Sequence, residues 1–162
     1  MTLFALFKLL HVASAIWVMT GLLARPVALV AARRAPDVRI LKAIADVSGR
    51  FEDFMIAPGF LAVIVTGLGT AVAGGFSLFG PLTGGPLWVF IPVVLLLLGV
   101  IATPLAIARD RRWGLALQDA AAQGVMTDRL RAYLDAGTML RRYAPDIVFA
   151  SLIVMLMVLK PF

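Results

Sequence analysis

The chain has 162 residues, of which 62% are hydrophobic and only 15% are charged, and its mean hydropathy is +0.99. Soluble domains are about 45–50% apolar and about 25% charged, so this composition excludes an ordinary water-soluble domain and a disordered chain. The absence of cysteine excludes disulfides and cysteine-ligated metal sites. The length fits one domain, and we expect residues 1–162 to form a single transmembrane domain.

The apolar residues fall into four segments of membrane-spanning length. No charged residue occurs between Phe54 and Ala108, and this run is long enough for two helices of about 20 residues each. A Gly- and Pro-rich stretch at 74–86 divides it. The first segment is interrupted only by Lys8 and Arg25. We therefore expect an all-α, four-helix transmembrane bundle with spans at about 3–31, 54–74, 86–108 and 143–160.

Lysine and arginine are unevenly distributed among the connections between these spans. The first connection holds five basic residues, the third holds seven, and the second holds none. Basic residues collect on the cytoplasmic side of a membrane, so both termini are predicted to lie outside the cytoplasm. The expected partners are the lipid bilayer and its anionic headgroups. Nucleic acid is not expected, because the arginines flank spans and are not interleaved with aromatic residues.

The connections contain helical patterns of their own. Apolar residues at helical spacing within 37–49 predict an extension of the second helix. The segment 127–142 predicts a short amphipathic helix, in which Thr127 is the N-cap and Leu130 and Leu134 share one face. We expect this helix to lie on the inner membrane surface, and a plain connector is the alternative.

Polar residues within the first and last spans lie on single helix faces. Positions 8, 11, 15, 18, 22 and 25 follow the alternating three- and four-residue spacing of one face, and positions 146, 150, 153, 157 and 160 do the same. The first stripe contains Lys8, His11 and Arg25, and the second contains Asp146, Met157 and Lys160. The two stripes are expected to face each other.

The depth of these residues suggests specific partners. Seventeen residues separate Lys8 from Arg25, a rise of about 25 Å, and the step from Lys160 back to Asp146 is similar. If the first and last helices pack antiparallel, these matching distances place Arg25 beside Asp146. Arg25 needs such a partner, because an unpaired arginine in a membrane costs several kcal/mol. We predict a structural Arg25–Asp146 ion pair. Asp53 and Glu52, at the start of the second span, are the rival partners of Arg25.

The same alignment sets His11 beside Met157. An imidazole and a thioether on facing helices could bind a haem iron or a soft metal ion. For haem, Lys8 and Lys160 would lie where the propionates emerge. The alternative is structural. In that interpretation His11 hydrogen-bonds a neighbouring carbonyl group and Met157 fills space in the core.

The sequence resembles a known group of membrane proteins. Lys8-Leu9-Leu10-His11, Trp17, Gly21-Leu22-Leu23 and Pro26 resemble the first helix of the HemJ/CopD-like group of small bacterial membrane proteins, and Arg50-Phe51, Pro58-Gly59 and Gly67 resemble its second helix. The ending Met157-Val158-Leu159-Lys160-Pro161 is similar to that of a related family of predicted four-helix integral membrane proteins of unknown function, which is the closer match.

This resemblance implies a bacterial inner-membrane location and, through the HemJ-like proteins, a haem b ligand at His11. Those proteins resemble protoporphyrinogen oxidases, and they carry a second histidine after the first helix and a His/Lys pair in the third. The corresponding segments here, 27–30 and 87–91, contain neither. The resemblance therefore implies the fold and topology rather than the oxidase reaction.

Three functions are compatible with these patterns. The first is a non-enzymatic accessory or binding protein, since no nucleophile–base constellation or phosphate-binding loop occurs in the sequence. The second is a haem- or porphyrin-binding redox protein that uses His11. The third is a small anion transporter component in which Lys8 and Arg25 line the path. Small residues in the second span, such as Gly67 and Gly69, would permit a homodimer or a membrane-protein partner.

Overall fold

The computed structural model describes residues 2–160, apart from the side chain of residue 81, and every regular element in that range is helical. The elements are α1 (Leu3–Ala32), α2 (Val38–Phe51), the π-helical turn η1 (Glu52–Ile56), α3 (Ala57–Ala73), the 3₁₀ turn η2 (Gly80–Leu82), α4 (Leu87–Gln123), α5 (Asp128–Leu134) and α6 (Ala136–Leu159). Because α2, η1 and α3 are continuous, four long helices result. Each is long and apolar enough to cross a membrane, which confirms the predicted fold class.

The helix boundaries follow from local capping chemistry. The side chains of Thr2, Asp37, Thr127 and Asp135 each accept hydrogen bonds from backbone N–H groups in the first turn of α1, α2, α5 and α6, respectively. These groups have no partner within the helix, so a side-chain acceptor stabilises the helix start. At the other end of α4, Gly124 adopts a φ of 68°, the left-handed conformation that ends many helices.

The long helices extend well past the predicted spans at one end of the molecule. The second helix begins at Val38 rather than near residue 54, α4 continues to Gln123, and α6 begins at Ala136. The extension of the second helix through 37–49 was predicted, and the other two were not. Charged residues end an apolar run without ending a helix, so each helix is longer than the apolar span within it.

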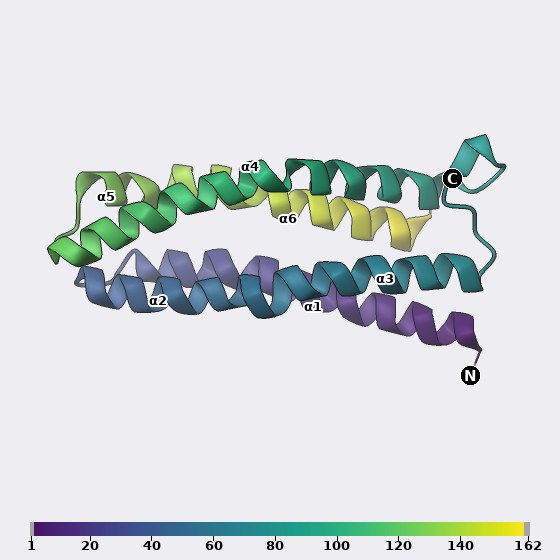
Figure 1. Ribbon diagram of the computed structural model, residues 1–162, viewed down its shortest axis with the longest axis horizontal. Helices are drawn as coiled ribbons and strands as arrows, with labels where there is room; N and C mark the ends of the chain where they lie inside the picture. The colour runs from purple at the N-terminus through teal and green to yellow at the C-terminus, as the bar shows by residue number, and fades with distance from the viewer. Residues whose placement is uncertain (1, 161–162) are drawn as a thin grey trace.

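The four long helices run side by side with both chain termini at the same end (Figure 1). The α1–α2 and α4–α5 connections lie at the opposite end of the bundle. We call this the arginine-rich end, and it comprises residues 33–53 and 109–142. The prediction that the two basic connections emerge together is therefore confirmed.

Close packing of α1 against α3 depends on glycine. A Cβ atom added at Gly59 would lie 2.6 Å from Val18 Cγ2, and one added at Gly69 would lie 2.4 Å from the ring of Phe7. A larger residue would force Val18 or Phe7 to shift, so these glycines let the two helices pack closely. The small residues of the second span thus serve packing within the chain.

The best-buried part of the protein is the arginine-rich end. Its core is formed by Val38, Leu41, Trp113, Leu117, Ala120, Leu130, Leu134 and Met139, together with the adjoining Leu29, Ala32 and Tyr143. By contrast, apolar side chains in the other half, such as Leu61, Ile101 and Leu105, are largely exposed. This distribution fits a bundle with one half surrounded by lipid and the other half projecting beyond it.

The short helix α5 belongs to this core. Leu130 is fully buried and Leu134 nearly so, in a cluster that includes residues of α1, α2 and α4. The sequence correctly predicted the helix and its Thr127 cap, but its apolar face is not open to lipid, as we expected for a helix that rests on the membrane surface. Its apolar face is covered by the other helices instead.

Candidate functional site

Ionisable side chains from all four long helices meet where the arginine-rich end begins. Arg25 of α1 donates from Nη1 to Glu52 Oε2 at 2.5 Å and from Nη2 to Asp110 Oδ2 at 2.6 Å. The other oxygen of the Asp110 carboxylate accepts from Nη2 of Arg142, on α6, at 2.7 Å. One carboxylate on α4 therefore holds two guanidinium groups from two other helices.

Two further residues extend this network toward its edge. Arg109 Nη2 lies 3.3 Å from Asp146 Oδ2, and Arg109 Nε lies 3.6 Å from Asp110 Oδ1. We call Arg25, Glu52, Arg109, Asp110, Arg142 and Asp146 the charged cluster. It contains three basic and three acidic groups, so its formal charge is zero. Mutual neutralisation makes it possible to bury Arg142 and to bury much of Arg25 and Asp110, because unpaired charges in a protein interior are strongly destabilising.

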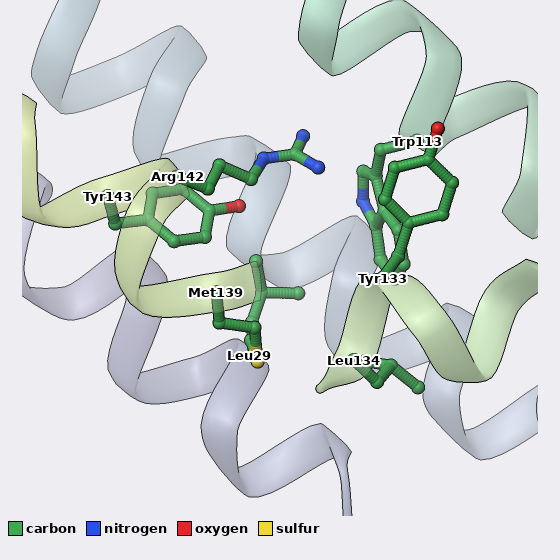
Figure 2. A pocket seen from close by; sticks show the side chains of 7 residues that line it. All are labelled: Leu29, Trp113, Tyr133, Leu134, Met139, Arg142 and Tyr143. Atoms are coloured by element: carbon green, nitrogen blue, oxygen red, sulfur yellow. The ribbon is translucent and has the colours of Figure 1, made fainter. Parts of the chain in front are cut away.

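Aromatic rings enclose the most buried arginine. Arg142 is only 7% exposed, and its guanidinium carbon lies 5.7 Å from the ring centroid of Trp113 and 5.5 Å from that of Tyr143. Figure 2 shows these three side chains together with Met139 and Leu29. A guanidinium near aromatic faces gains cation–π attraction, which is strongest where water is excluded. The rings therefore hold Arg142 in the orientation that Asp110 requires.

Backbone irregularity coincides with the cluster. Glu52 is the first residue of the π-helical turn η1 that joins α2 to α3, and such turns re-aim side chains within an otherwise regular helix. One turn earlier, the buried Ser48 donates from Oγ to the backbone carbonyl of Arg25 at 3.3 Å. α1 and the second long helix are thus joined by a backbone contact beside their ion pair.

The predicted partner of Arg25 is wrong. Among the described residues, Arg25 contacts Glu52 and Asp110, whereas Asp146 contacts Arg109. Glu52 was one of the two rival partners, and the other, Asp53, is exposed and takes part in no ion pair in the described range. The error lies in rotation: α6 does contact α1, but the face of α6 that meets Arg25 carries Tyr143 rather than Asp146.

His11 faces α3. Its Nδ1 lies 3.0 Å from the carbonyl oxygen of Val63 and 3.3 Å from Thr66 Oγ1. A Cβ atom added at Gly67 would lie 2.9 Å from the imidazole ring, so the ring packs directly on the α3 backbone. The hydrogen bond to a neighbouring carbonyl, which was the structural alternative, is therefore present.

The other three proposed haem residues have surroundings that differ from those of His11. Lys160 Nζ lies 4.6 Å above the ring of Trp88 on α4. Lys8 is exposed and Met157 is partly buried. The hydrogen-bond contacts of His11 go to Val63 and Thr66, and a shared haem site for these four residues stays a prediction.

Two central residues of the cluster were missed by sequence reasoning. Asp110 and Arg142 lie just outside the apolar runs and read as ordinary loop charges. A signal was available for Asp110, because it is the one acidic residue in the basic run 109–112. It also shares helical spacing with Trp113 and Leu117, which are buried.

Comparisons with known proteins agree with this architecture. A family model described as "Predicted integral membrane protein (DUF2269)" matches residues 5–161. No curated protein and no solved structure matches the chain. The match covers nearly the whole sequence, so the protein is an integral multi-pass membrane protein with four candidate spans, and the chain belongs to the DUF2269 family of predicted integral membrane proteins.

Proposed function

We propose that the protein is a non-enzymatic accessory or binding protein of the inner membrane. The observation that carries the proposal is the charged cluster, in which the carboxylate of Asp110 is shared by Arg25 and Arg142. Its side chains are used to join four helices. This arrangement favours a structural role for the cluster over a catalytic role or a transport role. An anion path lined by Arg25 is disfavoured, because Arg25 is already bound to two carboxylates.

The proposal includes an orientation with the arginine-rich end in the cytoplasm. Thirteen of the fifteen basic residues lie between residues 25 and 142, and retention of basic segments on the cytoplasmic side supports this direction. In this orientation the buried core of α2, α5 and the ends of α1, α4 and α6 forms a small cytoplasmic head. A head of this kind gives an accessory protein a folded surface outside the lipid.

Cysteine labelling tests the orientation cleanly, because the chain contains no cysteine. Leu82→Cys and Val125→Cys place single thiols at exposed positions at opposite ends of the molecule. In intact cells, a membrane-impermeant maleimide should label Leu82→Cys and spare Val125→Cys until the membrane is permeabilised. Labelling of Val125→Cys alone in intact cells would reverse the orientation.

Thermal unfolding tests whether the charged cluster holds the helices together, a role that we call a structural lock. If the cluster is a structural lock, removal of one charged side chain should lower the midpoint of thermal unfolding in detergent. If the side chain serves catalysis or transport instead, its removal should leave the midpoint unchanged or raise it. Asp110→Asn is the informative variant, since it keeps the shape and removes the charge. An unchanged midpoint would contradict the lock.

A second candidate function is supported by one observation at His11. The carbonyl of Val63 can only accept, so Nδ1 of His11 carries the proton in this contact and leaves the lone pair on Nε2. Histidines that bind metals are commonly oriented by such a bond, so His11 fits the role of a single axial haem ligand. Met157, Lys8 and Lys160 lack a comparable supporting contact.

Absorbance spectroscopy separates the two candidates. Protein purified from cells supplied with a haem precursor should show a Soret band if His11 binds haem, and His11→Ala should remove it. Thr20→Val on the same helix is a suitable control, because the Thr20 hydroxyl donates within its own helix, to the carbonyl of Ile16. A band that survives His11→Ala would contradict a haem ligand at this position.

A further inference from the structure

A groove opens among three helices at the arginine-rich end of the molecule. It has a volume of about 160 Å³ and lies beside the charged cluster, between α1, α2 and α4. Its walls include Arg25 from α1, Asp46 and Gly49 from α2, and Trp113 and Gly114 from α4. An indole ring, a guanidinium group and two bare stretches of backbone therefore face one space.

The two glycines have no packing reason to be glycine. A Cβ atom added at Gly49 or Gly114 would meet nothing within 4 Å, and neither residue has a positive φ. Glycine in the middle of a helix is less favourable than alanine. Elsewhere in the chain helical glycines such as Gly59 touch another helix closely. Here they keep the groove wide and expose backbone to whatever enters it.

Two arginines do not line the groove themselves, but helical spacing places each of them beside a residue that does. Arg50 lies four residues after Asp46, and Arg111 lies three residues before Gly114, so each shares a helix face with a residue of the wall. Both arginines are exposed, and neither takes part in an ion pair among the described residues. The nearby Asp46 is already paired with Lys42 at 2.6 Å.

The depth of these arginines identifies their partner. Arg50 precedes the uncharged run that starts at Phe54 by four residues, and Arg111 follows its end at Ala108 by three. Both therefore lie about one helical turn, roughly 5 Å, beyond the apolar zone, which is the level of lipid phosphates. Outside the charged cluster, segments 33–53 and 111–141 hold ten basic and six acidic residues, so the surrounding field attracts anions.

We propose that this groove binds the headgroup of an anionic phospholipid from the adjacent leaflet. The phosphate lies between Arg50 and Arg111, and the headgroup enters the space beside Gly49 and Gly114. Charge complementarity at phosphate depth favours a lipid over a second copy of the chain, whose own rim would carry the same two arginines. The site goes beyond the proposed function and does not depend on it.

Native mass spectrometry of the full-length protein, released from detergent micelles, measures the lipids that stay bound. Protein is incubated with phosphatidylglycerol or with phosphatidylcholine of the same acyl chains. We expect retention of phosphatidylglycerol over phosphatidylcholine, and at least a fivefold loss of retained phosphatidylglycerol in Arg50→Gln/Arg111→Gln. The matched control is Arg129→Gln/Arg131→Gln on α5, which removes the same charge away from the groove and should retain lipid within twofold of the unaltered protein.

A second variant tests the groove without changing charge. Gly114→Leu fills the space while leaving both arginines in place, so it should also reduce retention, whereas Gly114→Ala should have little effect. Equal retention of phosphatidylglycerol by the two double-arginine variants would mean that the overall positive charge, and not the groove, attracts the lipid. That result would overturn the proposed site. Displacement of phosphatidylglycerol by inorganic phosphate at equal concentration would assign the groove to a soluble anion and equally overturn the lipid proposal.

Discussion

Asp110 on α4 accepts a hydrogen bond of 2.7 Å from Arg142 on α6, although the two residues are 32 positions apart in the chain. The same carboxylate also binds Arg25 on α1, so it is the one acidic group through which both arginines reach α4. Without it Arg142 would be buried with no carboxylate partner, and Arg25 would keep only Glu52. The consequences can be measured in purified protein.

Loss of the Asp110 side chain should be the most destabilising single change in the cluster. Asp110→Ala leaves Arg142 buried without its carboxylate, and breaking a buried pair in this way costs about 3 kcal/mol in the free energy of unfolding. Chemical denaturation in mixed micelles measures this difference. Asp119→Ala, an exposed position on the same helix, is the control and should change the free energy by less than about 0.5 kcal/mol. Equal effects of the two variants would refute the shared-carboxylate arrangement.

Coupling between Asp110 and Arg142 should appear in a double-mutant cycle. Once Asp110 is replaced by alanine, removal of Arg142 takes away a charge that is already uncompensated, so the second change costs less than it does alone. We expect a coupling energy of about 1–3 kcal/mol. The cycle needs the unfolding free energies of Asp110→Ala, Arg142→Ala and the double variant. Strict additivity would mean that the 2.7 Å contact contributes nothing.

Two glycines on the same long helix should respond oppositely to alanine. At Gly59 the new Cβ would lie 2.6 Å from Val18 Cγ2, so Gly59→Ala should destabilise the protein by about 1–3 kcal/mol through overpacking. At Gly49 the space is open, and Gly49→Ala should stabilise it by about 0.5–1 kcal/mol. Thermal unfolding of the two variants provides the comparison. If Val18→Ala failed to rescue Gly59→Ala, the close contact between α1 and α3 would be in question.

The position of α5 in the core, rather than on a lipid surface, predicts a large effect at Leu130. This side chain is fully buried, and Leu130→Ala should cost about 2–5 kcal/mol. Leu140→Ala removes the same atoms from a side chain that is 68% exposed and should cost far less. Denaturation in detergent compares them directly. Similar losses of unfolding free energy in the two variants would contradict the burial of α5 in the core and favour a position on the membrane surface.

Much of the architecture was accessible from the sequence because it depends on local properties. The number of crossings follows from apolar run lengths, and the emergence of both basic connections at one end follows from an even number of helices between them. The Thr127 cap and the helix through 37–49 depend only on neighbouring residues. Burial of an arginine within the first span also required a partner, and Glu52 was among those considered.

The choice among partners was made by the tertiary structure. Whether Arg25 meets Asp146 or Asp110 depends on the rotation of α6 about its own axis and on the lateral order of the helices. The hydropathy pattern predicts neither of these. Close contact of α1 with α3 through Gly59, Gly67 and Gly69 fixes the first two helices. The core around Trp113 and Leu130 then fixes α4, α5 and α6 against them. Ion-pair contacts act over only a few ångströms. The carboxylate that each guanidinium meets therefore depends on the packing of the whole bundle, which local sequence patterns do not specify.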